Sequence, residues 1–262
     1  MGREKERHMN HTKIDWCDST WNPLTGCNHG CEYCYARGIA HRFGKQIPDS
    51  SGYPEMNHGM HCLENKIKNN PYPYLFEPTY HPYRLDEPAR KTAPQTIFVC
   101  SMADLFGDWV PTRIIEEVFD ACRNAPQHRY LFLTKNPQRY CDLANKKTLP
   151  NEDNFWYGTT VTHKGAPFFN GGVRYNAFLS IEPLLESLDA GIGSFGGVGW
   201  LIIGAETGNR ANRVKPEKEW IDNIIETAAL TKAAVFMKNN LSEAYQGELR
   251  KEFPWDGEKE DE

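Results

Sequence analysis

Short apolar runs alternate with amphipathic segments along the part of the chain that follows Pro94. Continuous apolar runs are typical of strands buried on both faces of a parallel sheet. Segments whose apolar residues recur three and four positions apart predict helices between those strands. The predicted strands are 96–100, 130–133, 155–161, 177–181, 200–203 and 233–237, and the predicted helices are 111–123, 137–144, 184–188 and 217–230.

The segment before these units predicts one more strand and one more helix. Residues 14–25 contain a short first strand, with Trp16 and Trp21 closing one end of the core. A cysteine-rich loop follows, and then a helix over 35–43, which Gly44 ends. With this unit the chain has about seven βα units. It therefore predicts an α/β fold, a partial (β/α) barrel of about six to seven parallel strands spanning residues 14–242.

Residues 45–94 interrupt this pattern with many prolines, tyrosines and histidines. A loop of this length without regular elements is usually functional or disordered, and its aromatic content argues against disorder. We predict an insertion that wraps the core, with a short helix near 84–90. Its aromatic residues either stack nucleic-acid bases or pack the insertion onto the barrel. Residues 1–13 are predicted to be a disordered arm, and residues 243–262 a solvated acidic tail.

Composition narrows the classes of function. The chain has 262 residues, 39% hydrophobic content and a net charge of −5, which argues against broad nonspecific nucleic-acid binding but allows a local basic groove. No apolar run approaches the ~20 residues that span a bilayer. The N-terminus lacks the apolar core of a secretory signal. Eight cysteines without such a signal predict a reducing, cytoplasmic location and a metal or cluster role for some of them.

Three cysteines lie within eight residues, at Cys27, Cys31 and Cys34. Three thiolates at this spacing can converge on one inorganic centre and leave one coordination position open, as reactive sites do. One alternative is a structural zinc site completed by His29 or His41. Another is a non-catalytic cluster protein that binds nucleic acid or a partner protein. The scattered cysteines Cys100, Cys122 and Cys141 are predicted to be small buried hydrophobic residues.

Polar residues follow each predicted strand where it ends. In a parallel barrel all these ends lie on one face, where active sites are built. The cysteine loop follows the first strand, so we expect it on that same face. Polar βα turns are common, but glutamates and a lysine directly after strands can lean over the barrel mouth. The candidate residues are Asp104, Thr159, Thr160, Glu182, Glu206 and Lys238.

The chain from Lys13 to about Leu241 resembles the radical S-adenosylmethionine (SAM) superfamily, and more specifically its phage-associated three-Cys-motif branch. The resemblance is carried by the segments KIDWCDSTWNPLTGC, CEYCYA, HPYRLDEP, IFVCSMADLFGD, APQHRYLFLTKNPQR, LSIEPLLESL, WLIIGAETG and VFMKNNL. Part of the insertion, residues 45–78, matches less well. The stretch HKGAPFFNGGVRYN also departs, because a clearer helix is expected there.

This resemblance implies that Cys27, Cys31 and Cys34 ligate a [4Fe–4S] cluster whose open iron binds SAM. One-electron reduction, by an electron-donor protein, would release a 5′-deoxyadenosyl radical that modifies a substrate. Further partners would be a small-molecule or nucleic-acid substrate, such as a base or nucleotide, and a partner protein.

The resemblance also assigns roles to single residues. Tyr33 would lie near the adenine of SAM. Met102, Ala103 and Asp104 replace the Gly-Gly-Glu turn that holds the SAM ammonium, and Thr159 or Thr160 would meet its ribose or carboxylate. Glu182, Glu206 and Lys238 are the candidate catalytic residues that hold a polar substrate. The alternative is a structural ion pair between Lys238 and Glu206.

Overall fold

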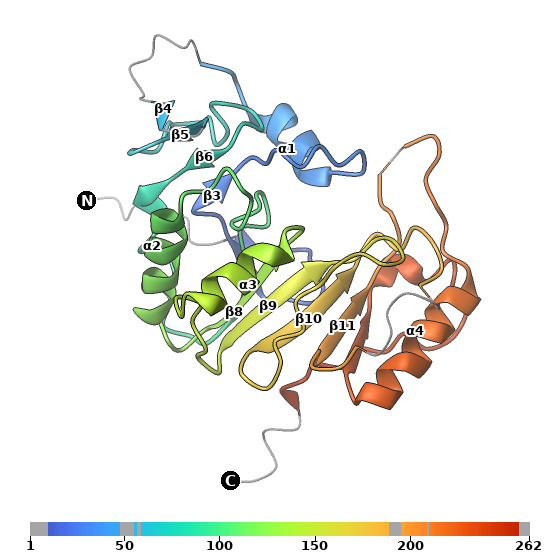
Figure 1. Cartoon of the computed structure of the whole chain (residues 1–262). Coiled ribbons are helices and arrows are strands. Elements are labelled where there is room, and N and C mark those ends of the chain that lie inside the picture. Colours follow the sequence, from blue (N-terminus) through green and yellow to red (C-terminus); the bar gives the residue numbers. More distant parts are fainter. Residues whose placement is uncertain (1–9, 48–54, 57–58, 189–194, 209, 257–262) are drawn as a thin grey trace. The chain divides into compact units, whose positions relative to one another are not determined.

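A half-barrel of seven parallel strands with surrounding helices forms the main body of the chain (Figure 1). The computed structural model describes residues 10–47, 55–56, 59–188, 195–208 and 210–256. The strand order is β1-β2-β7-β8-β9-β10-β11-β12, and β1 is antiparallel to β2. The strands are β1 (Asn10–His11), β2 (Ser19–Trp21), β7 (Thr96–Val99), β8 (Arg129–Thr134), β9 (Phe155–Thr160), β10 (Asn176–Ile181), β11 (Trp200–Ile203) and β12 (Ala234–Met237). The predicted partial barrel is confirmed.

The chain divides into two compact units. The first contains residues up to Gly30 together with 36–132. It holds β2, β7 and most of β8, the helix α2 (Thr112–Arg123), and nearly all of α1 (Tyr35–Phe43). Its core is aromatic. The ring of Phe119 lies 6.1 Å from that of Phe106 and 5.4 Å from that of Phe132, so α2 is fixed against the strands by T-shaped and tilted ring contacts.

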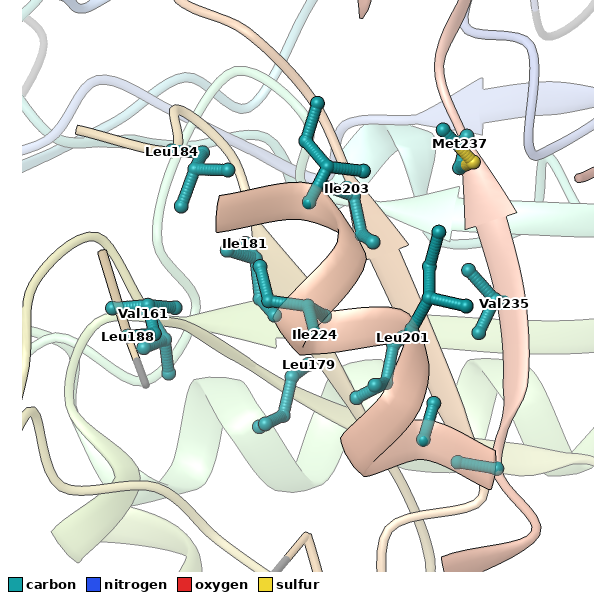
Figure 2. Close-up of a cluster of buried hydrophobic side chains, with 14 of the residues drawn as sticks. Val161, Leu179, Ile181, Leu184, Leu188, Leu201, Ile203, Ile224, Val235 and Met237 are labelled. Atoms are coloured by element: carbon teal, nitrogen blue, oxygen red, sulfur yellow. The ribbon is translucent and has the colours of Figure 1, made fainter. Parts of the chain in front are cut away.

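The second unit contains residues 31–35 and 133–262. Its helices are α3 (Pro137–Asn145) and α4 (Lys218–Thr231). The apolar residues of α4 recur at Ile221, Ile224, Ile225 and Ala228, the spacing of one helix face, and all four are buried. Figure 2 shows Ile224 among the side chains that β10 and β11 send to the same cluster, including Leu201. Packing in this cluster fixes β10, β11 and β12, whose carboxyl ends carry the candidate residues of the second unit.

The insertion is an ordered part of the first unit in the residues that the structure describes. It builds a second sheet in the order β3-β6-β5-β4. These strands are β3 (Leu24–Thr25), β4 (Glu55–Met56), β5 (Met60–Cys62) and β6 (Thr79–Tyr80). The aromatic side chains of Tyr74, Phe76 and Tyr80 are buried, so they pack the insertion and are not available to stack bases.

Two predicted short helices are wrong. Residues 184–188 are irregular with one bend at Glu186, because Leu184 and Leu188 are buried as single anchors in the hydrophobic cluster instead of on a helical face. Near 84–90 the chain forms successive turns after a single turn of 3₁₀ helix, η2 (Pro82–Arg84). The helix predicted from 111 begins at Thr112, with Pro111 as its N-cap in an extended conformation.

Both terminal segments contain more structure than a free arm or tail. Residues 10–11 of the predicted arm form β1, and residues 1–9 lie outside the described residues. Within the predicted tail, Lys251 bridges to Phe236, and Trp255 packs edge-on against Trp156 and Trp200. The tail follows the barrel because these large rings bury apolar area. Residues 257–262 lie outside the description.

In the described part of the chain, no helix has the length and apolar content that crossing a membrane requires.

Candidate functional site

The cysteine loop begins directly after β3, at a residue that has to be glycine. Gly26 has φ +82°, and a Cβ there would lie 2.2 Å from the carbonyl oxygen of Glu77. Its N–H donates to the carbonyl of Met102 at 2.9 Å, and it forms a parallel bridge with Ala103. The next residue, Cys27, is therefore fixed beside the turn that follows β7.

The turn after β7 carries the predicted Met102-Ala103-Asp104 segment. The Asn22 side-chain carbonyl accepts the Met102 N–H at 2.9 Å, and the Ala103 N–H donates to the carbonyl of Cys100 at 3.0 Å. The left-handed residue of this turn is Cys100, with φ +58°. Met102 and Ala103 keep negative φ, which explains how the turn forms without the glycine pair.

Asp104 is buried and already has partners. Its Oδ2 lies 2.7 Å from Nε2 of His29, which stands in the middle of the cysteine loop, and its Oδ1 accepts the Phe106 N–H at 3.0 Å. The His29 ring also meets Trp109 edge-on, with centroids 5.0 Å apart. Asp104 therefore holds the cysteine loop. The sequence indicated His29 only as a ligand of the alternative zinc site.

The second half of the cysteine loop belongs to the second unit. The Cys34 N–H donates to the carbonyl of Cys31 at 3.3 Å. Between them, the Tyr33 ring lies 5.8 Å from the ammonium of Lys135, which follows β8, and the Tyr33 hydroxyl bonds to Thr162, just after β9. Burial, and then the charge of a Cys31 thiolate, raises the pKa of Tyr33, so its phenol stays protonated.

Glu206, a buried carboxylate just after β11, is connected to this loop through Arg210. The side chain of Glu206 is 1% exposed, and Arg210 binds it with two hydrogen bonds, Nε to Oε1 at 2.7 Å and Nη2 to Oε2 at 2.8 Å. The Val214 N–H adds a third at 3.2 Å. The hydrogen bonds from Arg210 keep the pKa of Glu206 below its usual range. Nη1 of Arg210 also lies 3.2 Å from Glu32, the residue after Cys31.

Glu182 and Lys238 form a separate ion pair at the ends of β10 and β12. Their side chains are 22% and 17% exposed. A Cβ on Gly204 would lie 3.0 Å from both side chains, so a residue without a side chain leaves room for the pair. Lys238 thus pairs with Glu182, not with Glu206 as the structural alternative proposed. The loop that brings Arg210 to Glu206 carries no motif, so nothing in the sequence pointed to this pairing.

The two threonines after β9 differ in position. Thr159 is buried, and its Oγ1 accepts the N–H of Phe169 at 3.1 Å. It therefore holds the glycine-rich stretch 163–175, which forms turns in place of a helix. Thr160 is half-buried at the last position of β9.

All eight cysteines of the chain are in the thiol form, and they differ in burial. Cys62 and Cys100 are buried, which raises the pKa of the first to about 11 and of the second to about 12 and keeps them protonated. Cys122 is buried as predicted, whereas Cys141 is half-buried. The three cysteines of the loop, Cys27, Cys31 and Cys34, are half-buried, so they remain accessible to an incoming group.

The donor set can be tested against the two inorganic centres that the sequence suggests. Among the described residues, no group of three or more histidine, cysteine or acidic side chains is gathered as one metal ion requires. A [4Fe–4S] cluster takes one thiolate on each of three irons and leaves the fourth iron open to a ligand. Three half-buried thiols fit the cluster in number and chemistry.

A model of the family described as "protein of unknown function (DUF5131)" matches residues 11–258. The chain belongs to the DUF5131 family. No curated protein matches the sequence of this DUF5131 protein.

Two solved structures show which fold this DUF5131 protein shares. A mutant of spore photoproduct lyase, in which one cysteine is replaced by serine, superposes with a TM-score of 0.51 at 11% identity, covering 89% of this chain and 79% of that one. Spore photoproduct lyase complexed with dinucleoside spore photoproduct gives 0.51 at 11% identity, covering 90% and 80%. These likenesses support the radical SAM-like fold. Membership of the phage-associated branch stays a prediction.

Proposed function

We propose that this DUF5131 protein is a radical SAM enzyme that acts on a nucleic-acid base or nucleotide. The observation that carries the proposal is the setting of the Cys31–Cys34 segment. It contacts Lys135 after β8, Thr162 after β9 and Arg210 beyond β11. The carboxyl ends of parallel strands are where barrel enzymes build their active sites. A segment with two thiols that contacts residues following three of these strands is suited to chemistry on a ligand.

Cys27, Cys31 and Cys34 would hold the [4Fe–4S] cluster, and the open iron would bind SAM. When bound, the cluster and SAM supply a 5′-deoxyadenosyl radical after reduction by an electron-donor protein. The chain fixes the loop at two points. Asp104 binds His29 between the first two cysteines, and Arg210 binds Glu32 between the last two.

Tyr33 and Asp104 are the residues we assign to SAM. The Tyr33 ring, with Lys135 beside it, offers a flat surface for the adenine. Each oxygen of the Asp104 carboxylate holds a partner within the protein, His29 or the Phe106 N–H. Because an ionised carboxylate can accept about four hydrogen bonds, Asp104 can bind the loop and the SAM ammonium together. Thr160 is the better candidate for the ribose, because Thr159 is buried and engaged with Phe169.

Glu182 and Lys238 are the residues we assign to the substrate. They are partly exposed and carry opposite charges, so a polar base could replace one partner of each. Glu206 positions the loop that carries Arg210. A nucleic-acid substrate is supported by the fold shared with a lyase whose structure contains a dinucleoside photoproduct. We place the reaction in the cytoplasm, where cysteines persist as thiols.

The test is an anaerobic assay for 5′-deoxyadenosine after reconstitution with iron and sulfide. We expect a brown protein that forms 5′-deoxyadenosine from SAM under reducing conditions, faster with the correct nucleoside or damaged DNA. A matched pair of variants separates ligand thiols from other thiols. Cys34→Ala should abolish the product, and Cys141→Ala on α3 should leave it unchanged. A colourless protein that retains zinc would refute the proposal and favour the zinc-site alternative.

A further inference from the structure

The first unit carries a strongly basic surface that the proposed chemistry does not use. It is formed by two segments, residues 36–47 and 65–76, which we call the basic surface. Together they contain no Asp or Glu, although the whole chain has more acidic than basic residues, 35 against 30. The Lys and Arg residues of the two segments are Arg37, Arg42, Lys45, Lys66 and Lys68, and all of them are exposed.

Backbone contacts join the two segments. The side chain of Asn70 binds both backbone groups of Lys45, accepting its N–H at 3.0 Å and donating to its carbonyl at 2.6 Å. The Ile47 N–H donates to the carbonyl of Pro73 at 3.0 Å. A Cβ on Gly44 would lie 2.5 Å from the carbonyl oxygen of Tyr72, so the glycine permits this close approach. The two segments that carry the basic residues are therefore joined by the fold and do not belong to a loose tail.

An exposed aromatic residue lies beside one of these cations. Phe43, the last residue of α1, is 54% exposed, and the guanidinium of Arg42 lies 5.2 Å from its ring centroid. Arg37 lies 5.3 Å from the ring of Phe76. At this exposure the ring is available for stacking. Cations that follow a phosphate backbone, together with an aromatic face on which a base stacks, are how proteins bind single-stranded nucleic acid.

We propose that the basic surface binds single-stranded nucleic acid, with Phe43 stacking on a base and the surrounding Lys and Arg contacting phosphates. The net charge of the chain opposes binding to nucleic acid elsewhere, so this local surface would set where a strand is held. The inference rests on the proposed function, because it supplies the strand that a base-modifying enzyme needs. It also moves the proposed base stacking from Tyr74, Phe76 and Tyr80 of the insertion, which are buried, to the end of α1 (Figure 1).

The test measures binding of fluorescein-labelled dT12 and rU12 to the full-length, cluster-loaded protein by fluorescence anisotropy as salt increases. Phe43→Ala should weaken binding by roughly tenfold to a hundredfold. The triple variant Arg42→Gln, Lys45→Gln, Lys68→Gln should lower the slope of log K against log salt by about 2. Comparing the DNA and RNA strands shows whether the surface distinguishes the sugar.

Matched controls remove the same groups elsewhere. Leu230→Ala deletes an exposed apolar side chain on α4, and Lys146→Gln, Lys147→Gln, Lys232→Gln deletes three exposed charges. Both should bind like the unaltered chain. The proposal is overturned if neither strand binds, or if the controls lose as much affinity as the test variants. Uncoupled SAM cleavage by the test variants should be unchanged. If the unaltered protein binds the strands but does not cleave SAM, the proposed function is refuted and the basic surface is not.

Discussion

Two carboxylates follow neighbouring strands of the second unit, and they are held in different ways. Glu206 is almost fully buried and receives three hydrogen bonds, two of them from the planar guanidinium of Arg210. Glu182 has a single ammonium partner, Lys238, and about a fifth of each side chain is exposed. A bidentate pair fixes one geometry, whereas a flexible ammonium can change partners. The difference is the basis for our proposal that Glu206 maintains the loop and that Glu182 exchanges Lys238 for a substrate.

The largest expected effect is on turnover at Glu182. Glu182→Gln keeps the shape and removes the charge, so a charge-assisted contact to substrate would be lost. We expect substrate turnover to fall by roughly tenfold to a hundredfold, while uncoupled 5′-deoxyadenosine formation is retained. The unfolding free energy should change by less than about 1 kcal/mol, because the pair is partly exposed. If cleavage and melting temperature fall together, Glu182 is part of the fold and the comparison fails.

Of the two carboxylates, Glu206 should contribute more to the free energy of unfolding. Among the described residues, Glu206→Ala leaves the guanidinium of Arg210 with the exposed Glu32 as its one acidic partner. We expect a loss of about 2 kcal/mol, below the range for fully buried pairs because Arg210 keeps contact with water. Thermal denaturation measures this, and Glu226→Ala on the exposed face of α4 provides the control. Equal melting temperatures for both variants would contradict a structural role for Glu206.

A smaller effect is the dependence of folding stability on pH through Glu206. Because the pKa of Glu206 is lowered in the folded chain, the unfolded chain binds its proton more readily. The stability that Glu206 contributes is therefore present above the ordinary carboxyl value near 4.5 and is lost as pH falls through the lowered pKa. Denaturant unfolding at a series of acidic pH values should show a shallower acid dependence for Glu206→Gln. An unchanged dependence would mean that Arg210 does not stabilise the carboxylate.

Most strands of the sheet could be predicted, because a strand buried on both faces of a parallel sheet is a short continuous apolar run. The strand 200–203 and the helix 35–43 have the predicted bounds. The helix predicted at 184–188 was wrong because two leucines four residues apart, Leu184 and Leu188, fit one face of a helix as well as two separate buried positions in an irregular segment. The insertion could not be resolved from sequence, because its strands have only two or three residues and so carry no periodicity, and β6 pairs with the distant β3 and β5.

The candidate site was predictable in its residue types and not in its pairings. Asp104, Glu182, Glu206 and Lys238 could be found at strand ends, since parallel strands present their ends together. Which charge meets which depends on loop paths. Arg210 reaches Glu206 through a loop without a motif, and Lys238 therefore pairs with Glu182.

The most direct test of the central claim is the iron content of Cys31→Ala after anaerobic reconstitution. The intact protein should carry about four irons per chain and a visible absorption band. Two remaining thiolates are too few to hold the cluster, so Cys31→Ala should lose both, whereas Cys141→Ala should keep both. If Cys31→Ala retains full iron and its absorption, Cys27, Cys31 and Cys34 are not the ligand set, and the assignment of a radical SAM site to this loop is wrong.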